Sequence, residues 1–134
     1  MESMQQGDLR PIDAAECLEL LAVRTVGMVA FVDDDGQQLV PVNYVVRDGD
    51  VIFRTSADSF LAQLADGHED VAFATSHQAE LDQHGWNVTV RGRTSPQDAT
   101  DLVGAPPRTW AGGVRDVLVR LHPEHVSGRR VHLH

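Results

Sequence analysis

The chain has 134 residues, of which 42% are hydrophobic and 23% are charged, and these values are typical of one globular domain with a buried core. Its formal net charge of −9 argues against non-specific binding to nucleic acid, whose phosphates attract basic surfaces. The sequence contains a single cysteine and no lysine, which excludes an internal disulfide framework and any reaction that requires a lysine.

The N-terminal residues carry no targeting signal. The stretch MESMQQGDLR lacks the charged and then apolar pattern of a signal peptide, and no apolar run in the chain approaches the length that spans a bilayer. We therefore expect a cytoplasmic protein with no membrane partner. A single domain is expected over residues 1–134, with residues 1–11 disordered or forming an extended arm.

The first predicted element is a helix in the stretch IDAAECLELLAVR. Asp13 is a preferred N-cap residue, and Glu16 three positions later completes a capping box. The apolar residues recur at helical spacing and form one face: Leu18, Leu21 and Ala22. Cys17 lies within this helical pattern, so we interpret it as a buried core thiol and not as a nucleophile.

A series of strands follows the first helix. The stretch TVGMVAFVDDDG predicts a strand that runs into an acidic turn at residues 33–36. The stretch QQLVPVNYVVRDGDVIFRTS predicts two strands that flank Asp48-Gly49, a dipeptide that favours a two-residue hairpin turn. Pro41, near the start of its strand, has no amide hydrogen, which is tolerated at a sheet edge or a bulge.

The second half of the chain continues this pattern. A short helix is predicted around residues 58–66, then strands in EDVAFATSHQAEL and GWNVTVRGRTSPQD. Residues 97–103 are weakly helical, GAPPRTWAGG is a loop, and DVLVRLHPEHVSGRRVHL predicts two strands interrupted at residues 122–123 and 127–128. We predict a mainly β protein in which six antiparallel strands and short helices form a small closed or split β-barrel. Because the aromatic content is only 5%, one barrel buries little surface and a dimer is expected.

A group of polar residues lies where the strand ending at residue 56 passes into the short helix. Ser56 or Asp58 can cap that helix without any ligand. Arg54 is not explained in this way, because a cation is repelled by the positive end of a helix. An arginine, several hydroxyls and free helix amides are together what a phosphate group requires, so the junction is a candidate phosphate site.

Metal and hydrolase sites receive less support from the sequence. The chain has seven histidines, including pairs three apart at His122 and His125 and two apart at His132 and His134. No cysteine pair and no H-E-x-x-H motif accompanies them, so we interpret them as surface histidines and predict no metal site. The sequence also lacks the G-x-S-x-G motif of serine hydrolases and the G-x-G-x-x-G motif of dinucleotide-binding folds.

Three ordered blocks carry a family resemblance: GMVAFV through LVPVNYVV to DGDVIFRTS, then GWNVTVRGR, then VRLHPEHVSGRRV. In this order they resemble the pyridoxamine 5′-phosphate oxidase-like family, which has the FMN-binding split-barrel fold. The resemblance covers nearly the whole chain, from about Asp13 to Val131. It implies a homodimer with two FMN sites, each built from both subunits at their interface.

The resemblance also implies roles for particular residues. The stretch PVNY would run beside the edge of the isoalloxazine ring, and it comprises Pro41, Val42, Asn43 and Tyr44. Arg54, Thr55 and Ser59 would hold the phosphate, which accounts for the polar junction. Trp86 and Asn87 match a strand that supplies ring packing and a polar contact. Core or interface packing is an equal alternative for Tyr44 and Trp86.

One position departs from the family pattern. Members of the family commonly have a lysine or arginine after the serine that matches Ser59, and here that position is Phe60. The loss of one charged hydrogen bond weakens binding by about 1.5–3 kcal/mol, so FMN binds weakly or another cofactor replaces it, unless Arg91 or Arg93 contributes.

The function implied by the resemblance is a flavin-dependent oxidoreductase that acts on an unidentified small molecule. Hydride transfer would belong to the flavin, because no side chain stands out as a general acid or base. Trp110 and Arg115 would line the substrate pocket. The alternatives are a deazaflavin-dependent reductase and, from another class, a non-catalytic flavin or haem binder or a barrel without cofactor.

Overall fold

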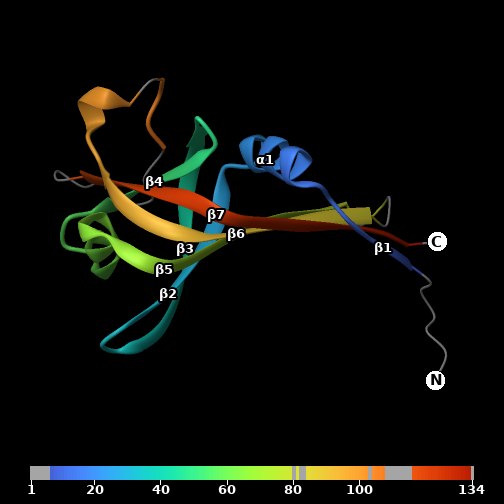
Figure 1. The fold of residues 1–134 in the computed structure, drawn as a ribbon, viewed down its shortest axis with the longest axis horizontal. Helices are drawn as coiled ribbons and strands as arrows, with labels where there is room; N and C mark the ends of the chain where they lie inside the picture. Colours follow the sequence, from blue (N-terminus) through green and yellow to red (C-terminus); the bar gives the residue numbers. More distant parts are fainter. Residues whose placement is uncertain (1–6, 80, 82–83, 103, 108–115, 134) are drawn as a thin grey trace.

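The computed structural model describes residues 7–79, 81, 84–102, 104–107 and 116–133. In chain order the elements are β1 (Gly7–Pro11), α1 (Ala14–Val23), β2 (Val26–Asp33), β3 (Gly36–Arg47), β4 (Asp50–Ser56), the 3₁₀ helix η1 (Phe60–Asp66), β5 (His68–Ala79), β6 (His84–Gln97), the 3₁₀ turn η2 (Ala99–Asp101) and β7 (Asp116–Leu133) (Figure 1).

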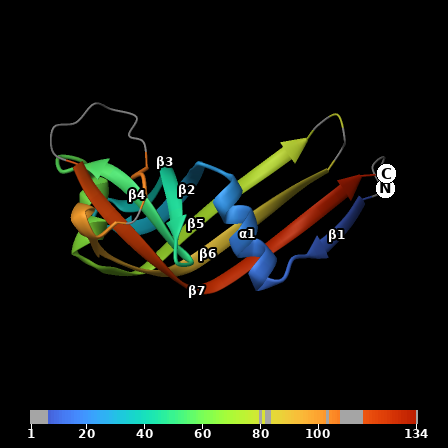
Figure 2. The ribbon, with the colours of Figure 1, turned by 90° about the horizontal axis from the view of Figure 1, so that it is seen from above.

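The strands form one antiparallel sheet that closes on itself. Their order is β1-β7-β4-β3-β2-β5-β6, and β6 also pairs with β7. Strands β2 to β7 therefore make the predicted six-stranded barrel, and β1 adds to it as a further strand along the end of β7. One end of the sheet extends away from the barrel as an arm (Figures 1 and 2), formed by residues 76–79, 84–87 and 129–133 together with β1.

Helix α1 lies against β6 and β7 at the start of this arm (Figure 2). The Asp13 carboxylate accepts a hydrogen bond from the Glu16 amide at 2.8 Å, which confirms the predicted cap. Cys17 and Leu21 are fully buried in the core. Burial raises the pKa of the Cys17 thiol, so the thiolate is disfavoured and the prediction of an inert core thiol is confirmed.

The β3–β4 hairpin has the predicted turn. Asp48 and Gly49 have φ angles of 55° and 81°, both in the left-handed region, as a type I′ turn requires. Pro41 pairs with Met28 of β2, whereas the ladder between β3 and β4 covers only residues 44–47 of β3. The side of Pro41 that faces away from β2 is therefore an open sheet edge, which tolerates a missing amide.

Two predicted elements differ in the structure. The short helix is a 3₁₀ helix whose N-cap is Ser59, not Ser56 or Asp58. Strand β7 is continuous, because it pairs with β4 on one side and β6 on the other. Pro123 does not interrupt it, since it faces Gly92 where the β6–β7 register shifts. A Cβ atom at Gly92 would clash with the carbonyl oxygen of His122, so only glycine fits this close approach.

The barrel interior is filled by large apolar side chains, and the largest that are fully buried are Tyr44, Phe53 and Phe73. Tyr44 and Phe53 are cross-strand neighbours in the β3–β4 ladder, and the Tyr44 ring meets the Phe73 ring edge-on at 4.7 Å between centroids. Within the described residues no helix is long and apolar enough to cross a lipid bilayer.

Candidate functional site

The polar junction lies at the end of β4. Arg54 is half-buried and faces Leu118 of β7, while Thr55, one residue on, turns inward and is 7% exposed. Tyr44 and Phe53 form the last pair of the β3–β4 ladder. Asn43 and Arg54 are the next residues of the two strands beyond that pair, and both are half-buried, with the Arg54 Nε atom buried.

Ser59 and Phe60 follow this pair at the start of η1. The Ser59 hydroxyl oxygen accepts a hydrogen bond from the Leu61 amide at 3.1 Å, which makes it the cap of the helix. Phe60 is 46% exposed and stacks on the buried Phe31 ring at 6.1 Å between centroids. The position at which the family resemblance predicts a cation is thus a half-exposed aromatic ring that partly covers the end of the barrel core.

Helix η1 is attached to the β2–β3 turn by a cluster of polar contacts. The Asp33 carboxylate accepts hydrogen bonds from the side chains of Gln38 at 3.1 Å and Gln63 at 3.2 Å. These bonds, that from Gln38 foremost, lower the pKa of the Asp33 carboxyl group. The imidazole of His68, which begins β5, contacts the carbonyl oxygen of Val32 at 3.1 Å. Gln63 therefore joins η1 to the end of β2, and Gln38 and His68 join β3 and β5 to the same end of β2.

Residues 41–44 of β3 divide between the two faces of the sheet. Val42 and Tyr44 point into the core, whereas Pro41 is exposed and Asn43 is half-buried. The Tyr44 hydroxyl donates to the carbonyl oxygen of Leu21 at 2.6 Å, and burial raises the pKa of Tyr44 to about 12. Tyr44 is thus a core residue, in agreement with the alternative that the sequence left open for it.

Trp86 and Asn87 lie far from the junction within one chain. Arg54 faces Leu118 of β7, whereas Trp86 faces Arg130, twelve residues further along the same strand, or about 40 Å at roughly 3.3 Å per residue. The Trp86 ring packs near His77 in the arm. The structure therefore does not bring the two predicted groups together in one protomer. Trp110 and Arg115 lie outside the described residues.

A groove on the outer face of the barrel was not found from the sequence. Its volume is about 650 Å³, which is within the usual range for ligand sites. One row of cross-strand neighbours forms part of its lining, from β3 to β7: Leu39, Ala30, Ala72, Arg91 and His125. The alanines leave room for a ligand on two central strands. Only knowledge of the strand register could have revealed the row, because its members come from five strands.

Arg91 and His125, which are both exposed, lie at one end of this groove, whose lining also contains the carboxylates of Glu69, Asp70 and Glu124. Neither Arg91 nor His125 makes a hydrogen bond or ion pair with another residue in the part of the chain that the structure describes.

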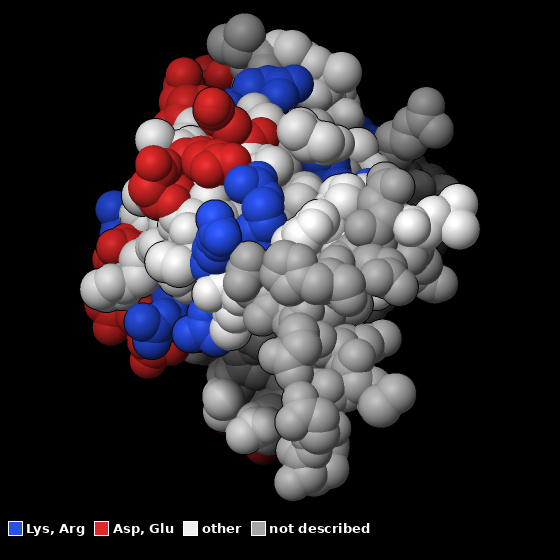
Figure 3. Space-filling model, turned by 90° about the vertical axis from the view of Figure 1, so that its right-hand side faces the viewer, with Lys and Arg blue, Asp and Glu red and all other residues white. Residues whose placement is uncertain are grey.

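On the side that carries β1 and the end of β7, basic and acidic side chains lie in adjoining patches (Figure 3). Patches of both signs do not favour nucleic-acid binding on that side. The described residues contain no group of three or more potential metal ligands.

We compared the sequence and the structure with known proteins. A family model with the description pyridoxamine 5′-phosphate oxidase matches residues 13–130. An uncharacterised protein of Mycobacterium tuberculosis is 29% identical over 127 residues, which are 90% of this chain and 84% of the relative.

Two solved structures show the same fold. The FAD-binding protein of Mycobacterium smegmatis is 29% identical, with a TM-score of 0.75 over 90% of this chain and 98% of the other. The FAD- and haem-binding protein of the same organism is 13% identical, with a TM-score of 0.65 over 87% of this chain and 70% of the other. The likeness to the second protein extends to the fold alone.

Proposed function

Because the chain belongs to the pyridoxamine 5′-phosphate oxidase family, we propose that it binds a flavin nucleotide and uses it to oxidise or reduce a small molecule. The observation that supports this proposal is that Asn43 and Arg54 are the first residues of β3 and β4 beyond the last pair of their ladder, Tyr44 with Phe53. An arginine binds phosphate through charged hydrogen bonds. An asparagine amide can both donate and accept at the edge of a flavin ring.

The chemistry of the donor groups fits a phosphate that is held by a single strong cation. Arg54 supplies the charge, and Ser59 adds a hydroxyl whose hydrogen is available although its oxygen caps η1. Thr55 contributes less, because only 7% of its surface is exposed. Phe60 adds no charge, so the affinity for FMN depends mainly on Arg54.

A second copy of the chain would complete the site. Trp86 and Asn87 are about 40 Å along β7 from the position of Arg54, so both groups can contact one flavin only if two subunits contribute. The outer faces of β2 and β3 carry several exposed apolar side chains suited to such an interface: Val26, Met28, Val32 and Leu39. The proposed assembly is therefore a homodimer with a flavin at each shared site.

The groove suggests a second candidate for the cofactor, namely a flavin nucleotide larger than FMN. Leu39 in the groove and Asn43 at the junction share the outer face of β3, and the four residue steps from one to the other span about 13 Å. A nucleotide bound at Asn43 would reach along β3 into the groove, where Arg91 can donate to a second anionic group against the opposing charge of Glu69, Asp70 and Glu124 in the same lining. FAD or a deazaflavin with an anionic tail carries further charged groups beyond the first phosphate, whereas FMN has a single phosphate.

The proposed division of labour leaves the electron transfer to the cofactor, which when bound supplies hydride chemistry at flavin N5. Arg54 and Ser59 would anchor the phosphate, and Asn43 would orient the ring edge. Phe60 would shield the phosphate end from water on one side. Tyr44 would support the strand from within the core, because its hydroxyl is already bonded to Leu21.

The absorption spectrum of the purified protein tests this proposal. We expect flavin absorption bands, either as purified or after addition of FMN or FAD followed by removal of free cofactor. Addition of NADH or NADPH should bleach the bands, and a small-molecule acceptor such as a quinone should restore them. A haem spectrum, or no retained chromophore with any of these cofactors, would favour the haem-binding or cofactor-free alternative. Retained flavin that no donor bleaches would indicate a non-catalytic binder.

A further inference from the structure

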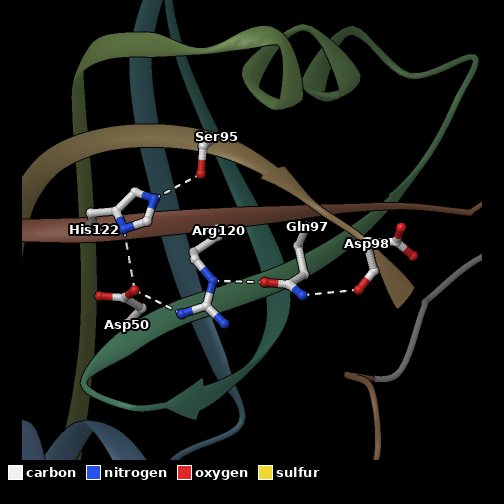
Figure 4. A network of polar contacts seen from close by, with 6 residues as sticks. All are labelled: Asp50, Ser95, Gln97, Asp98, Arg120 and His122. Atoms are coloured by element: carbon white, nitrogen blue, oxygen red, sulfur yellow. Dashed lines mark hydrogen bonds and ion pairs between the residues drawn. The ribbon is translucent and has the colours of Figure 1, made fainter. Parts of the chain in front are cut away.

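Three polar side chains from three strands form a hydrogen-bonded chain on the barrel (Figure 4). The hydroxyl of Ser95 in β6 lies 2.7 Å from Nε2 of His122 in β7. Nδ1 of the same imidazole lies 3.2 Å from Oδ2 of Asp50, the first residue of β4. The side chains of His122 and Asp50 are 27% and 21% exposed, so these hydrogen-bonded groups are largely packed but still partly in contact with solvent.

The protonation pattern of this chain follows from the chemistry of its members. An ionised carboxylate can only accept hydrogen bonds, so a neutral His122 donates its Nδ1 hydrogen to Asp50. Its Nε2 atom then has a free lone pair and accepts the hydroxyl hydrogen of Ser95. This is the arrangement in which an imidazole acts as a general base toward a serine hydroxyl, and it is recognised by geometry and not by sequence position.

Arg120 holds the carboxylate at one end of the chain. Its Nη1 donates to Asp50 at 2.7 Å and its Nε donates to Gln97 at 2.6 Å, so the guanidinium is fixed on both sides. Arg120 is also the direct cross-strand neighbour of Ser95. Its third nitrogen, Nη2, has no hydrogen-bond partner among the described residues, and it can donate to an anion that forms next to the serine oxygen.

We propose that Ser95 is an acyl-accepting nucleophile, with His122 as its general base, Asp50 as the residue that positions His122, and small carboxylic esters as the substrate class. The Ser95 oxygen attacks the ester carbonyl carbon while His122 Nε2 takes the hydroxyl proton. Arg120 stabilises the resulting oxyanion. The bond to the alcohol oxygen then breaks, and this oxygen leaves with the proton from His122.

Water completes the cycle by the same route. His122 takes a proton from a water molecule, whose oxygen attacks the acyl carbon and releases the carboxylic acid, and the proton returns to Ser95. No group is oxidised or reduced, so this activity is independent of the proposed flavin. Asp50 lies at the opposite end of β4 from Arg54, which separates the two sites in the fold.

A covalent probe for activated serines tests this proposal. Full-length protein is incubated with a fluorophosphonate, and the modified residue is located by peptide mass spectrometry. We expect a single adduct on Ser95, together with hydrolysis of p-nitrophenyl acetate that is lost in Ser95→Ala. The variant Ser127→Ala, which alters an exposed serine of β7, should retain both reactions. An adduct on another residue, or no adduct, overturns the proposal, and Ser95, His122 and Asp50 then form a structural hydrogen-bond network only.

The role of the imidazole is tested by a matched pair of histidine variants. His122→Gln should lower the labelling rate at least about 100-fold, the usual contribution of a general base, whereas His132→Gln, at an exposed histidine of the same strand, should leave it unchanged. Asp50→Asn should also slow labelling. Circular dichroism melting of each variant separates this loss from unfolding. Folded His122→Gln protein that is labelled as fast as the wild type would contradict the proposal, whatever the outcome of the flavin experiment.

Discussion

Two outward arginines on neighbouring strands, Arg120 of β7 and Arg54 of β4, belong to opposite ends of the β4 strand. Arg120 is clamped between Asp50 and Gln97 by hydrogen bonds of 2.7 and 2.6 Å, so its charge is used within the fold. Arg54 lies toward the other end, two residues before β4 ends at Ser56. Under the proposed function, the two arginines differ in their main partner: Arg120 contacts side chains of the fold, and Arg54 also contacts a ligand.

Strand β3 also has neighbouring residues with different roles, and the largest effect on stability is expected there. Tyr44 faces the core and is the only tyrosine of the chain, whereas its neighbour Asn43 faces outward. The folded pKa of Tyr44 is raised to about 12, above the unfolded value of about 10. Its contribution to stability is therefore complete below pH 10 and is lost as the pH rises toward 12, by about 2–3 kcal/mol.

Phenolate absorbance measures this directly, because no other residue contributes a tyrosine signal. The native protein should titrate near pH 12 and the denatured protein near pH 10. A native phenol that ionises near pH 10 would show that Tyr44 is accessible, and the core assignment would be wrong.

The next largest effect on stability is expected at the β3–β4 hairpin turn, which precedes β4. Gly49→Val should lower the free energy of unfolding by about 2 kcal/mol, because a β-branched residue is strained at a φ of 81°. The control is Asp48→Gly, which relieves a non-glycine residue at a φ of 55° and should be neutral or slightly stabilising. Thermal melting of both variants checks this, and equal melting temperatures for Gly49→Val and wild type would refute the turn geometry.

Exchanging the two arginines for alanine tests the comparison itself. Arg54→Ala should weaken flavin binding at least about tenfold, the effect of one charged phosphate contact, and should hardly change the melting temperature of the apoprotein. Arg120→Ala should do the reverse, because it leaves the half-buried Asp50 carboxylate without its cation. If Arg54→Ala lowers apoprotein stability as much as Arg120→Ala does, Arg54 serves a structural ion pair.

The smallest expected effect is at Phe60. Phe60→Lys introduces the charge that the family resemblance predicts here and should tighten FMN binding by several-fold, less than a buried charged contact gives, because the position is 46% exposed. The gain should shrink with added salt and be absent for riboflavin, which has no phosphate. Weaker FMN binding by the lysine variant would mean that the contact between Phe60 and Phe31 shapes the site.

The features that the sequence predicted correctly are those with local causes. The Asp13 cap and the Asp48-Gly49 turn depend on residues at most three apart, and both are present. The alternation of apolar residues sufficed for a six-stranded barrel. Pro123 misled the prediction because its effect depends on a register shift opposite Gly92, and nothing in β7 alone encodes that shift.

The candidate sites also depend on strand pairing that the sequence alone does not reveal. Arg54 could be singled out because it breaks the electrostatic rule for a helix start. By contrast, Ser95, His122 and Asp50 come from three strands separated by long stretches of chain, and the groove row comes from five. Their meeting is set by tertiary pairing, so spacing rules such as G-x-S-x-G contain no information about it.

The central claim is that Arg54 makes this end of β4 a phosphate-binding site for a flavin. Its most direct test is a fluorescence titration of the wild-type protein with FMN and with riboflavin under the same conditions. The account predicts that FMN binds at least about tenfold more tightly, since one charged hydrogen bond contributes about 1.5–3 kcal/mol. Equal affinities for the two, or no binding of either, would contradict it.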